Sequence, residues 1–188
     1  MNNKVKFMTT TALMTAILCI LGPLSIPIGP VPISLTNFAI YIIMYVVGTK
    51  SGTVAYLLYL LLGTVGLPVF SGFQGGIGKV VGPTGGYLIG FIPMALLCGI
   101  CFKRHYKNIL LCVIVMEAST WIAYVMGSLW LAFQAHMTIP AAFAAGVFPF
   151  ALEDFLKMVI AGILGPVLVK ALAPLGLNLP ENSTKAAA

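Results

Sequence analysis

The chain has 188 residues, of which 60% are hydrophobic and only 7% are charged, and its formal net charge is +6. Soluble domains carry about 25% charged residues, so this composition excludes an ordinary water-soluble fold and indicates an all-α integral membrane protein. No polar stretch is long enough to form a second domain, so we expect residues 1–188 to form one transmembrane domain.

Apolar runs predict six transmembrane helices in one bundle. Their approximate limits, in chain order, are 7–24, 33–47, 53–69, 84–102, 108–131 and 148–170. A helix that crosses the hydrocarbon core needs about 20 residues, and the second and third runs are shorter than this. One of them is therefore a candidate for an irregular or re-entrant segment, and five spans remain an alternative.

The first run resembles a signal peptide because Lys4 and Lys6 precede it. However, Leu21-Gly22-Pro23 is a poor cleavage sequence and five further runs follow. We therefore expect the first helix to be retained.

The distribution of cations predicts the orientation of the bundle. Six spans with a cytoplasmic N-terminus leave only Lys79 outside, and Lys157 lies within a span. The cations then placed on the cytoplasmic side are Lys4, Lys6, Lys50, Lys103, Arg104, Lys107, Lys170 and Lys185. This positive-inside bias predicts that both termini are cytoplasmic. It also accounts for the net charge without a nucleic-acid partner.

Residues 71–87 contain seven glycines and should form a loop on the extracellular side, between the third and fourth helices. They are not a phosphate-binding loop, because Phe73 and Val80 stand where that motif needs Gly and Ser or Thr. The loop is either a flexible connection or a lid whose glycines let the backbone approach a ligand, and the short third run favours the lid. Gly86 and Gly90 have the G-x-x-x-G spacing of close helix packing.

Two further patterns carry no function. Cys98 and Cys101 have the C-x-x-C spacing of redox and zinc sites, but no second ligand pair accompanies them, so no metal site is predicted. His105 and His136 both fall in connections between predicted helices, which leaves an enzymatic function with little support.

Three ionisable residues, Glu153, Asp154 and Lys157, interrupt the first third of the last apolar run. Lys157 is three positions from Asp154 and four from Glu153, so the three side chains can share a helix face. Placing Asp or Lys at the centre of a membrane helix costs about 2.5–3.5 kcal/mol each. We therefore expect Asp154 and Lys157 to face the interior and bind a polar solute, rather than to form only a packing pair, while Glu153 can reach the headgroups.

Glu117 lies in the fifth run, at a depth within one helical turn of Lys157. Our hypothesis is that Glu117 faces the same interior as Lys157 and that Trp121, one turn further out, forms an apolar wall. A carboxylate acceptor and an ammonium group within apolar walls suit a small, partly apolar molecule that is anionic or carries an amide.

Four segments of the sequence resemble signatures of BioY, the biotin-binding subunit (S component) of energy-coupling factor (ECF) transporters. They are GPVPISLTNFAIY (29–41), GLPVFSGFQGGIGKVVGPTGGYLIGF (66–91), GSLWL (127–131) and GVFPFALEDFLK (146–157). The segments keep the family order, and together they are specific.

The resemblance implies a substrate-binding membrane subunit that captures biotin from outside with high affinity in a prokaryotic cell membrane. Delivery then needs a transmembrane coupling protein (T component) and two ABC ATPase subunits. Biotin is the transported ligand, no cofactor is implied, and the protein is not an enzyme.

The resemblance also implies roles for individual residues. Asp154 and Lys157 match the D-x-x-K motif for biotin recognition, and Glu153 departs from the family because a less acidic residue is expected beside the motif aspartate. The matching segments add Asn37, Gly75, Gly76 and Tyr87 as expected ligand-binding residues. Ala12 and Ala16 match an A-x-x-x-A pattern for docking on the coupling protein, although Ala141 and Ala145 have the same spacing.

A second functional class remains open from the residues alone. The chain lacks a Walker A motif, so concentrative uptake would need ATPase partners. The alternative is a stand-alone secondary transporter or channel for a small carboxylated solute, in which the intramembrane charges form a proton or ion relay.

Overall fold

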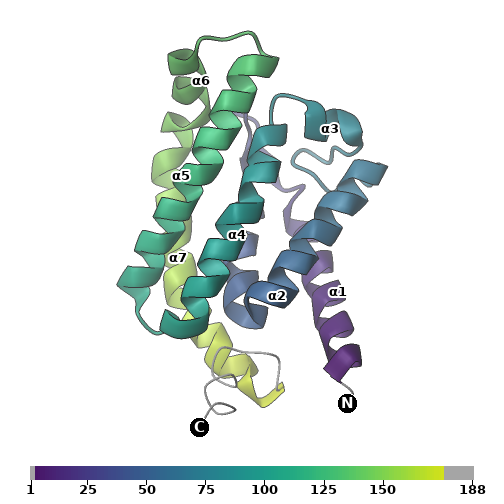
Figure 1. Cartoon of the computed structure of the whole chain (residues 1–188), viewed down its shortest axis with the longest axis vertical. Coiled ribbons are helices and arrows are strands. Elements are labelled where there is room, and N and C mark those ends of the chain that lie inside the picture. The colour runs from purple at the N-terminus through teal and green to yellow at the C-terminus, as the bar shows by residue number, and fades with distance from the viewer. Residues whose placement is uncertain (1–2, 176–188) are drawn as a thin grey trace.

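A computed structural model describes residues 3–175, and these residues form an all-helical bundle with one small two-stranded sheet (Figure 1). Lys185, one of the cations used to predict orientation, lies outside the described residues.

The helices of the bundle differ widely in length. The long ones are α1 (Asn3–Leu21), α2 (Thr36–Val65), α4 (Gly85–His105), α5 (Ile109–Gln134) and α7 (Phe148–Leu172). The short elements are β1 (Ser25–Ile26), β2 (Ile33–Ser34), α3 (Ile77–Val81), α6 (Ile139–Gly146) and the 3₁₀ turn Ala173–Leu175. Five helical segments are long and apolar enough to cross a membrane, with α6 and α7 counted together.

Helix α2 combines two of the predicted spans, and it reverses direction at Gly48. This residue has φ 74° and ψ −179°, a backbone conformation open to glycine and strained for other residues. Contacts between α2 and α4 show this reversal. Before Gly48, Tyr41 contacts Met94 and Tyr45 stacks on Phe102, so the partner on α4 moves toward its C-terminus. After Gly48, Tyr56 donates to the Leu88 carbonyl, back near the N-terminus of α4. The first half of α2 therefore runs along α4 in one direction and the second half returns in the other (Figure 1).

Small residues let α4 approach α5 closely. A Cβ atom on Gly90 would lie 2.8 Å from the Cα of Ala123, and one on Gly86 would lie 2.3 Å from the Cβ of Trp130. The prediction that Gly86 and Gly90 mark close helix packing is confirmed.

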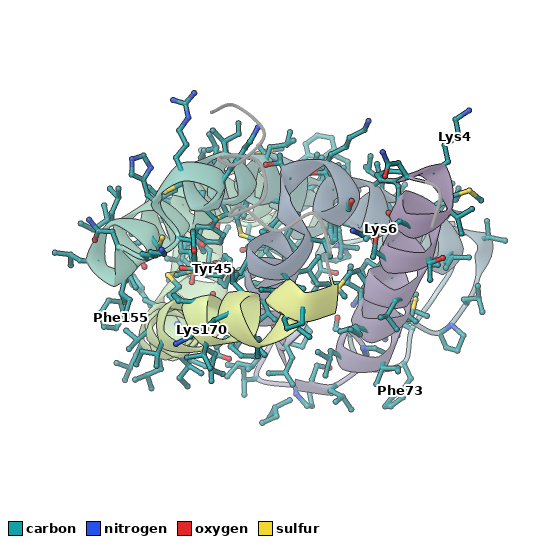
Figure 2. The ribbon with its side chains drawn as sticks, turned by 90° about the horizontal axis from the view of Figure 1, so that it is seen from below. Lys4, Lys6, Tyr45, Phe73, Phe155 and Lys170 are labelled. Atoms are coloured by element: carbon teal, nitrogen blue, oxygen red, sulfur yellow. The ribbon has the colours of Figure 1, made fainter. Side chains whose placement is uncertain are left out.

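The bundle has two distinct ends. Helices α3 and α6 and the first turn of α7 lie at one end, hereafter the α3 end, and α1 begins at the other (Figure 1). Figure 2, viewed from that opposite end, shows α1 at one edge of the bundle and Tyr45 between the helices.

The glycine-rich segment is more ordered than a flexible connection. It contains the helical turn α3, which the sequence analysis did not predict. Backbone hydrogen bonds fix its start, because Gly72 N–H donates to the Pro23 carbonyl (3.0 Å) and Gly76 N–H donates to the Gly63 carbonyl (2.7 Å). Side chains of α5 fix its end, because Trp130 Nε1 donates to the Gly82 carbonyl (2.9 Å) and Gln134 donates to that of Val81.

Candidate functional site

A cleft opens at the α3 end of the bundle, and it holds about 630 Å³ including its mouth. Small-ligand sites typically combine apolar walls with a few polar groups. The apolar walls include Val31, Leu88, Phe91 and Phe150, and the polar lining includes Ser34, Asn37, Lys79, Thr84, Tyr87, Tyr124, Glu153, Asp154 and Lys157.

Asp154 lies at the centre of a hydrogen-bond network in the cleft and is only 6% exposed. Its Oδ1 accepts from Asn37 Nδ2 at 2.6 Å, and its Oδ2 accepts from the Tyr124 hydroxyl at 2.6 Å. Lys157 Nζ lies 3.2 Å from Oδ1. Helices α2, α5 and α7 therefore converge on one carboxylate, and these donors stabilise its negative charge.

Lys157 is 8% exposed and sits among acceptors from two parts of the chain. Its ammonium group donates to the backbone carbonyl of Ser34 and to Asn37 Oδ1, and it forms ion pairs with Glu153 and Asp154. Both Asp154 and Lys157 thus avoid lipid, in line with the cost of charged groups in a membrane.

Tyr87 joins three helices at the edge of the cleft. Its hydroxyl lies 3.2 Å from Ser128 Oγ on α5 and donates to the Gly146 carbonyl at the end of α6 at 3.1 Å. A Cβ atom on Gly146 would lie 1.9 Å from that hydroxyl, so the approach requires glycine. This contact fixes the turn from which α7 begins.

Lys79 of α3 lines the mouth of the cleft. Burial lowers the pKa of its ammonium group. Among the described residues Lys79 takes part in no ion pair, unlike Lys157. It is therefore a second cation available to a ligand.

Gly75 and Gly76 do not line the cleft that contains Asp154. Gly75 belongs to an adjoining cavity that shares Lys79 and Thr84 with the cleft. A Cβ atom on Gly75 would lie 2.3 Å from the Leu67 carbonyl, and Gly76 has φ 92°. These two glycines shape the segment that carries Lys79, and their expected contact with the ligand stays a prediction.

Glu117 and Trp121 are placed differently from our hypothesis. Neither lines the cleft, and Trp121 is 46% exposed. Trp121 Nε1 donates to Glu117 Oε1 at 3.0 Å, one turn away on the same helix. The hypothesis that both share an interior with Lys157 is wrong in this structure, because depth along α5 does not fix the direction in which a side chain points.

Ala12 and Ala16 are both exposed on α1, away from the cleft. Within the described residues no three His, Cys, Asp or Glu side chains could together hold a metal ion, and the four cysteines are free thiols.

Sequence reasoning missed Tyr124, Ser34 and Lys79 as members of the site. A tyrosine inside an apolar run carries no signal of its own, and Ser34 acts through its backbone. Lys79 was the one cation that the predicted topology left outside, and that isolation could have marked it.

The fold and the cleft define a class: a helical membrane protein that binds a small polar ligand at one end of its bundle. Residues 1–174 of the chain match the BioY family. The biotin transporter BioY2 of Lactococcus lactis subsp. cremoris is 35% identical over 172 residues, which are 92% of this chain and 94% of the relative. The biotin transporter BioY of Thermotoga maritima is 39% identical over 158 residues, which are 84% of this chain and 92% of the relative.

A solved structure agrees with these relatives. The S-component for biotin from an ECF-type ABC transporter, determined at 2.1 Å, superposes with a TM-score of 0.82 and 33% sequence identity. The match covers 90% of this chain and 95% of that one. The chain belongs to the BioY family.

Proposed function

We propose that this chain is the biotin-capturing S component of an ECF-type importer. The relatives named above are biotin transporters, and the cleft supplies the chemistry that biotin needs. The observation that carries the proposal is the buried cluster in which Asp154, Lys157, Asn37 and Tyr124 converge on the cleft.

In this proposal the cluster receives the ureido ring and Lys79 receives the carboxylate. Asp154 is an acceptor for ureido N–H groups, and Asn37 and Lys157 are donors for the ureido carbonyl. The charge of Lys157 is already balanced by two carboxylates, whereas Lys79 at the mouth has no ion pair among the described residues. The apolar body of biotin then lies against Leu88, Phe91 and Phe150.

We also infer that the bundle crosses the cell membrane six times, with the α3 end outside. The break at Gly48 lets the two halves of α2 each cross once. Lys4, Lys6 and Lys170 lie at the opposite end, as Figure 2 shows. Lys103, Arg104 and Lys107 surround the α4–α5 connection at the same end. The positive-inside rule then assigns this end and the N-terminus to the cytoplasm.

Accumulation of biotin would depend on a T component and two ABC ATPase subunits. The exposed pair Ala12 and Ala16 on α1 offers a surface that another helix can approach closely. This placement leaves the cleft free while the partner is bound.

The test measures biotin binding to the purified chain by calorimetry, and then biotin uptake in cells with and without the ATPases. We expect tight binding by the solitary chain and accumulation only with active ATPases. Asp154→Asn should weaken binding, while Glu117→Gln, a change of the same kind outside the cleft, should not. Accumulation at full rate without ATPases would favour a stand-alone transporter, and absence of biotin binding would overturn the proposal.

A further inference from the structure

The ionisable groups of the cleft carry balanced charge before any ligand is considered. Two ammonium groups, Lys79 and Lys157, face two carboxylates, Glu153 and Asp154. An anionic ligand brings a third carboxylate into the same confined space. Like charges repel strongly where water is scarce, so this arrangement favours the addition of one proton.

Glu153 and Asp154 differ in how well their charge is stabilised. Asp154 accepts from Asn37 and Tyr124 and is paired with Lys157. Glu153 is paired with Lys157 through Oε1 only, and its Oε2 is buried without a described hydrogen-bond partner. Donors to a carboxylate favour its charged form, so a proton goes to Glu153 in preference to Asp154.

The other groups facing the cleft do not compete for this proton. They are Lys79 from α3, Tyr87 from α4, Tyr124 from α5, Asp154 and Lys157 from α7, and the uncharged Asn37 from α2. An ordinary tyrosine hydroxyl already holds its proton at neutral pH, and Lys157 is a donor that is paired with both carboxylates. Glu153 also lies nearer the solvent than its neighbours, because its side chain is 26% exposed against 10% for Lys157 and 8% for Asp154.

We propose that the cleft binds a proton together with an anionic ligand, and that Glu153 is the carboxylate that receives it. The proton comes from bulk water and bonds to Oε2, while Oε1 keeps its contact with Lys157. The protonated Oε2 then becomes a donor and can hydrogen-bond to an acceptor on the ligand. This inference rests on the proposed function, since it uses biotin as the anionic ligand.

The experiment is calorimetric titration of the purified chain with biotin at neutral pH, in buffers of different ionisation enthalpy. The dependence of the heat on the buffer gives the number of protons taken up per biotin. We expect uptake that approaches one proton, and a biotin affinity that falls by up to about tenfold per pH unit as the pH rises. Biotinamide, which has no carboxylate, should bind with the uptake of fewer protons.

Three variants identify the acceptor. Glu153→Gln should bind biotin without proton uptake, because the neutral amide already mimics the protonated acid. Glu117→Gln, the matched change outside the cleft, should keep the proton uptake of the wild-type chain. Biotin binding without proton uptake by the wild-type chain would overturn this inference alone, as would full uptake by Glu153→Gln. Absence of biotin binding would overturn the proposed function and this inference with it.

Discussion

Helices α7 and α1 are both long and apolar, yet α7 buries charged side chains whereas α1 exposes small ones. The first turns of α7 direct Asp154 and Lys157 into the bundle, where both are almost fully buried. Helix α1 packs mainly on α2 and leaves Ala12 and Ala16 exposed. In a membrane chain, buried charge marks a place for a polar ligand, and exposed small residues mark a place for another helix. Binding and docking should therefore be separable by mutation.

The largest effect should come from Lys157→Met. This change leaves Glu153 and Asp154 without their shared cation, and breaking a buried ion pair costs about 3–5 kcal/mol. We expect biotin affinity to fall by at least about 100-fold, the equivalent of about 2.8 kcal/mol. Calorimetry gives the affinity, and thermal unfolding in detergent separates lost binding from lost folding. A dissociation constant within threefold of wild type would show that the ligand does not depend on this cluster.

Bulky residues on α1 should produce the opposite pattern. In the double variant Ala12→Leu and Ala16→Leu the partner helix can no longer approach closely, so uptake in cells with all partners should fall about tenfold or more. Biotin binding to the purified chain should stay unchanged. Ala141→Leu is the control, because Ala141 and Ala145 have the same spacing as Ala12 and Ala16 but lie on α6. This change should leave biotin uptake by the cells intact. If the α1 variants lost binding too, docking and capture would not be separate.

Tyr124→Phe tests how far the cluster extends into α5. It removes the hydroxyl that donates to Asp154, and hydrogen bonds to charged groups contribute about 1.5–3 kcal/mol. We expect affinity for biotin to fall about tenfold, with little change in thermal unfolding because the ring remains. Calorimetry on Tyr124→Phe and on its combination with Asp154→Asn measures the coupling. Simple additivity of the two changes would mean that Tyr124 does not act through Asp154.

Lys79→Gln should have the smallest effect, and it should depend on the ligand. Loss of a partly exposed cation near the biotin carboxylate should lower the affinity for biotin about fivefold and leave the affinity for biotinamide unchanged. Because burial lowers the pKa of Lys79, its ammonium group loses its proton earlier than usual as the pH rises. The wild-type preference for biotin over biotinamide should therefore shrink as the pH rises, at a lower pH than for an ordinary lysine, and that decline should be absent in Lys79→Gln. An equal loss of affinity for both ligands would show that the biotin carboxylate does not bind at Lys79.

The sequence was sufficient to predict the helical membrane fold and the inward orientation of the charges on α7. The energy of burying a charge in lipid constrains Asp154 and Lys157 strongly, so only an interior position was open to them. For Glu117 only depth was known, and a small rotation of α5 separates the cleft from the exposed face that Trp121 occupies. Tyr124 has no formal charge, so no comparable cost revealed that it points at Asp154.

The predictions for α2 and the glycine-rich segment were limited for another reason. Two short apolar runs separated by a few residues predict a loop, but the turn at Gly48 needs only one residue with positive φ. The glycines of 71–87 left a flexible connection and a lid both open, with the lid favoured. Backbone hydrogen bonds to residues distant in the sequence, such as Pro23 and Gly63, hold the segment and its helical turn α3. Such contacts leave no local pattern.

The two halves of α2, which meet at the non-helical Gly48, link the two surfaces compared above. Its first half carries Asn37, which contacts both Asp154 and Lys157. Its second half supports α1, where Thr15 Oγ1 donates to the Ala55 carbonyl at 3.3 Å. The two halves of α2, joined at Gly48, therefore connect α1 to the residue that holds Asp154 and Lys157 together.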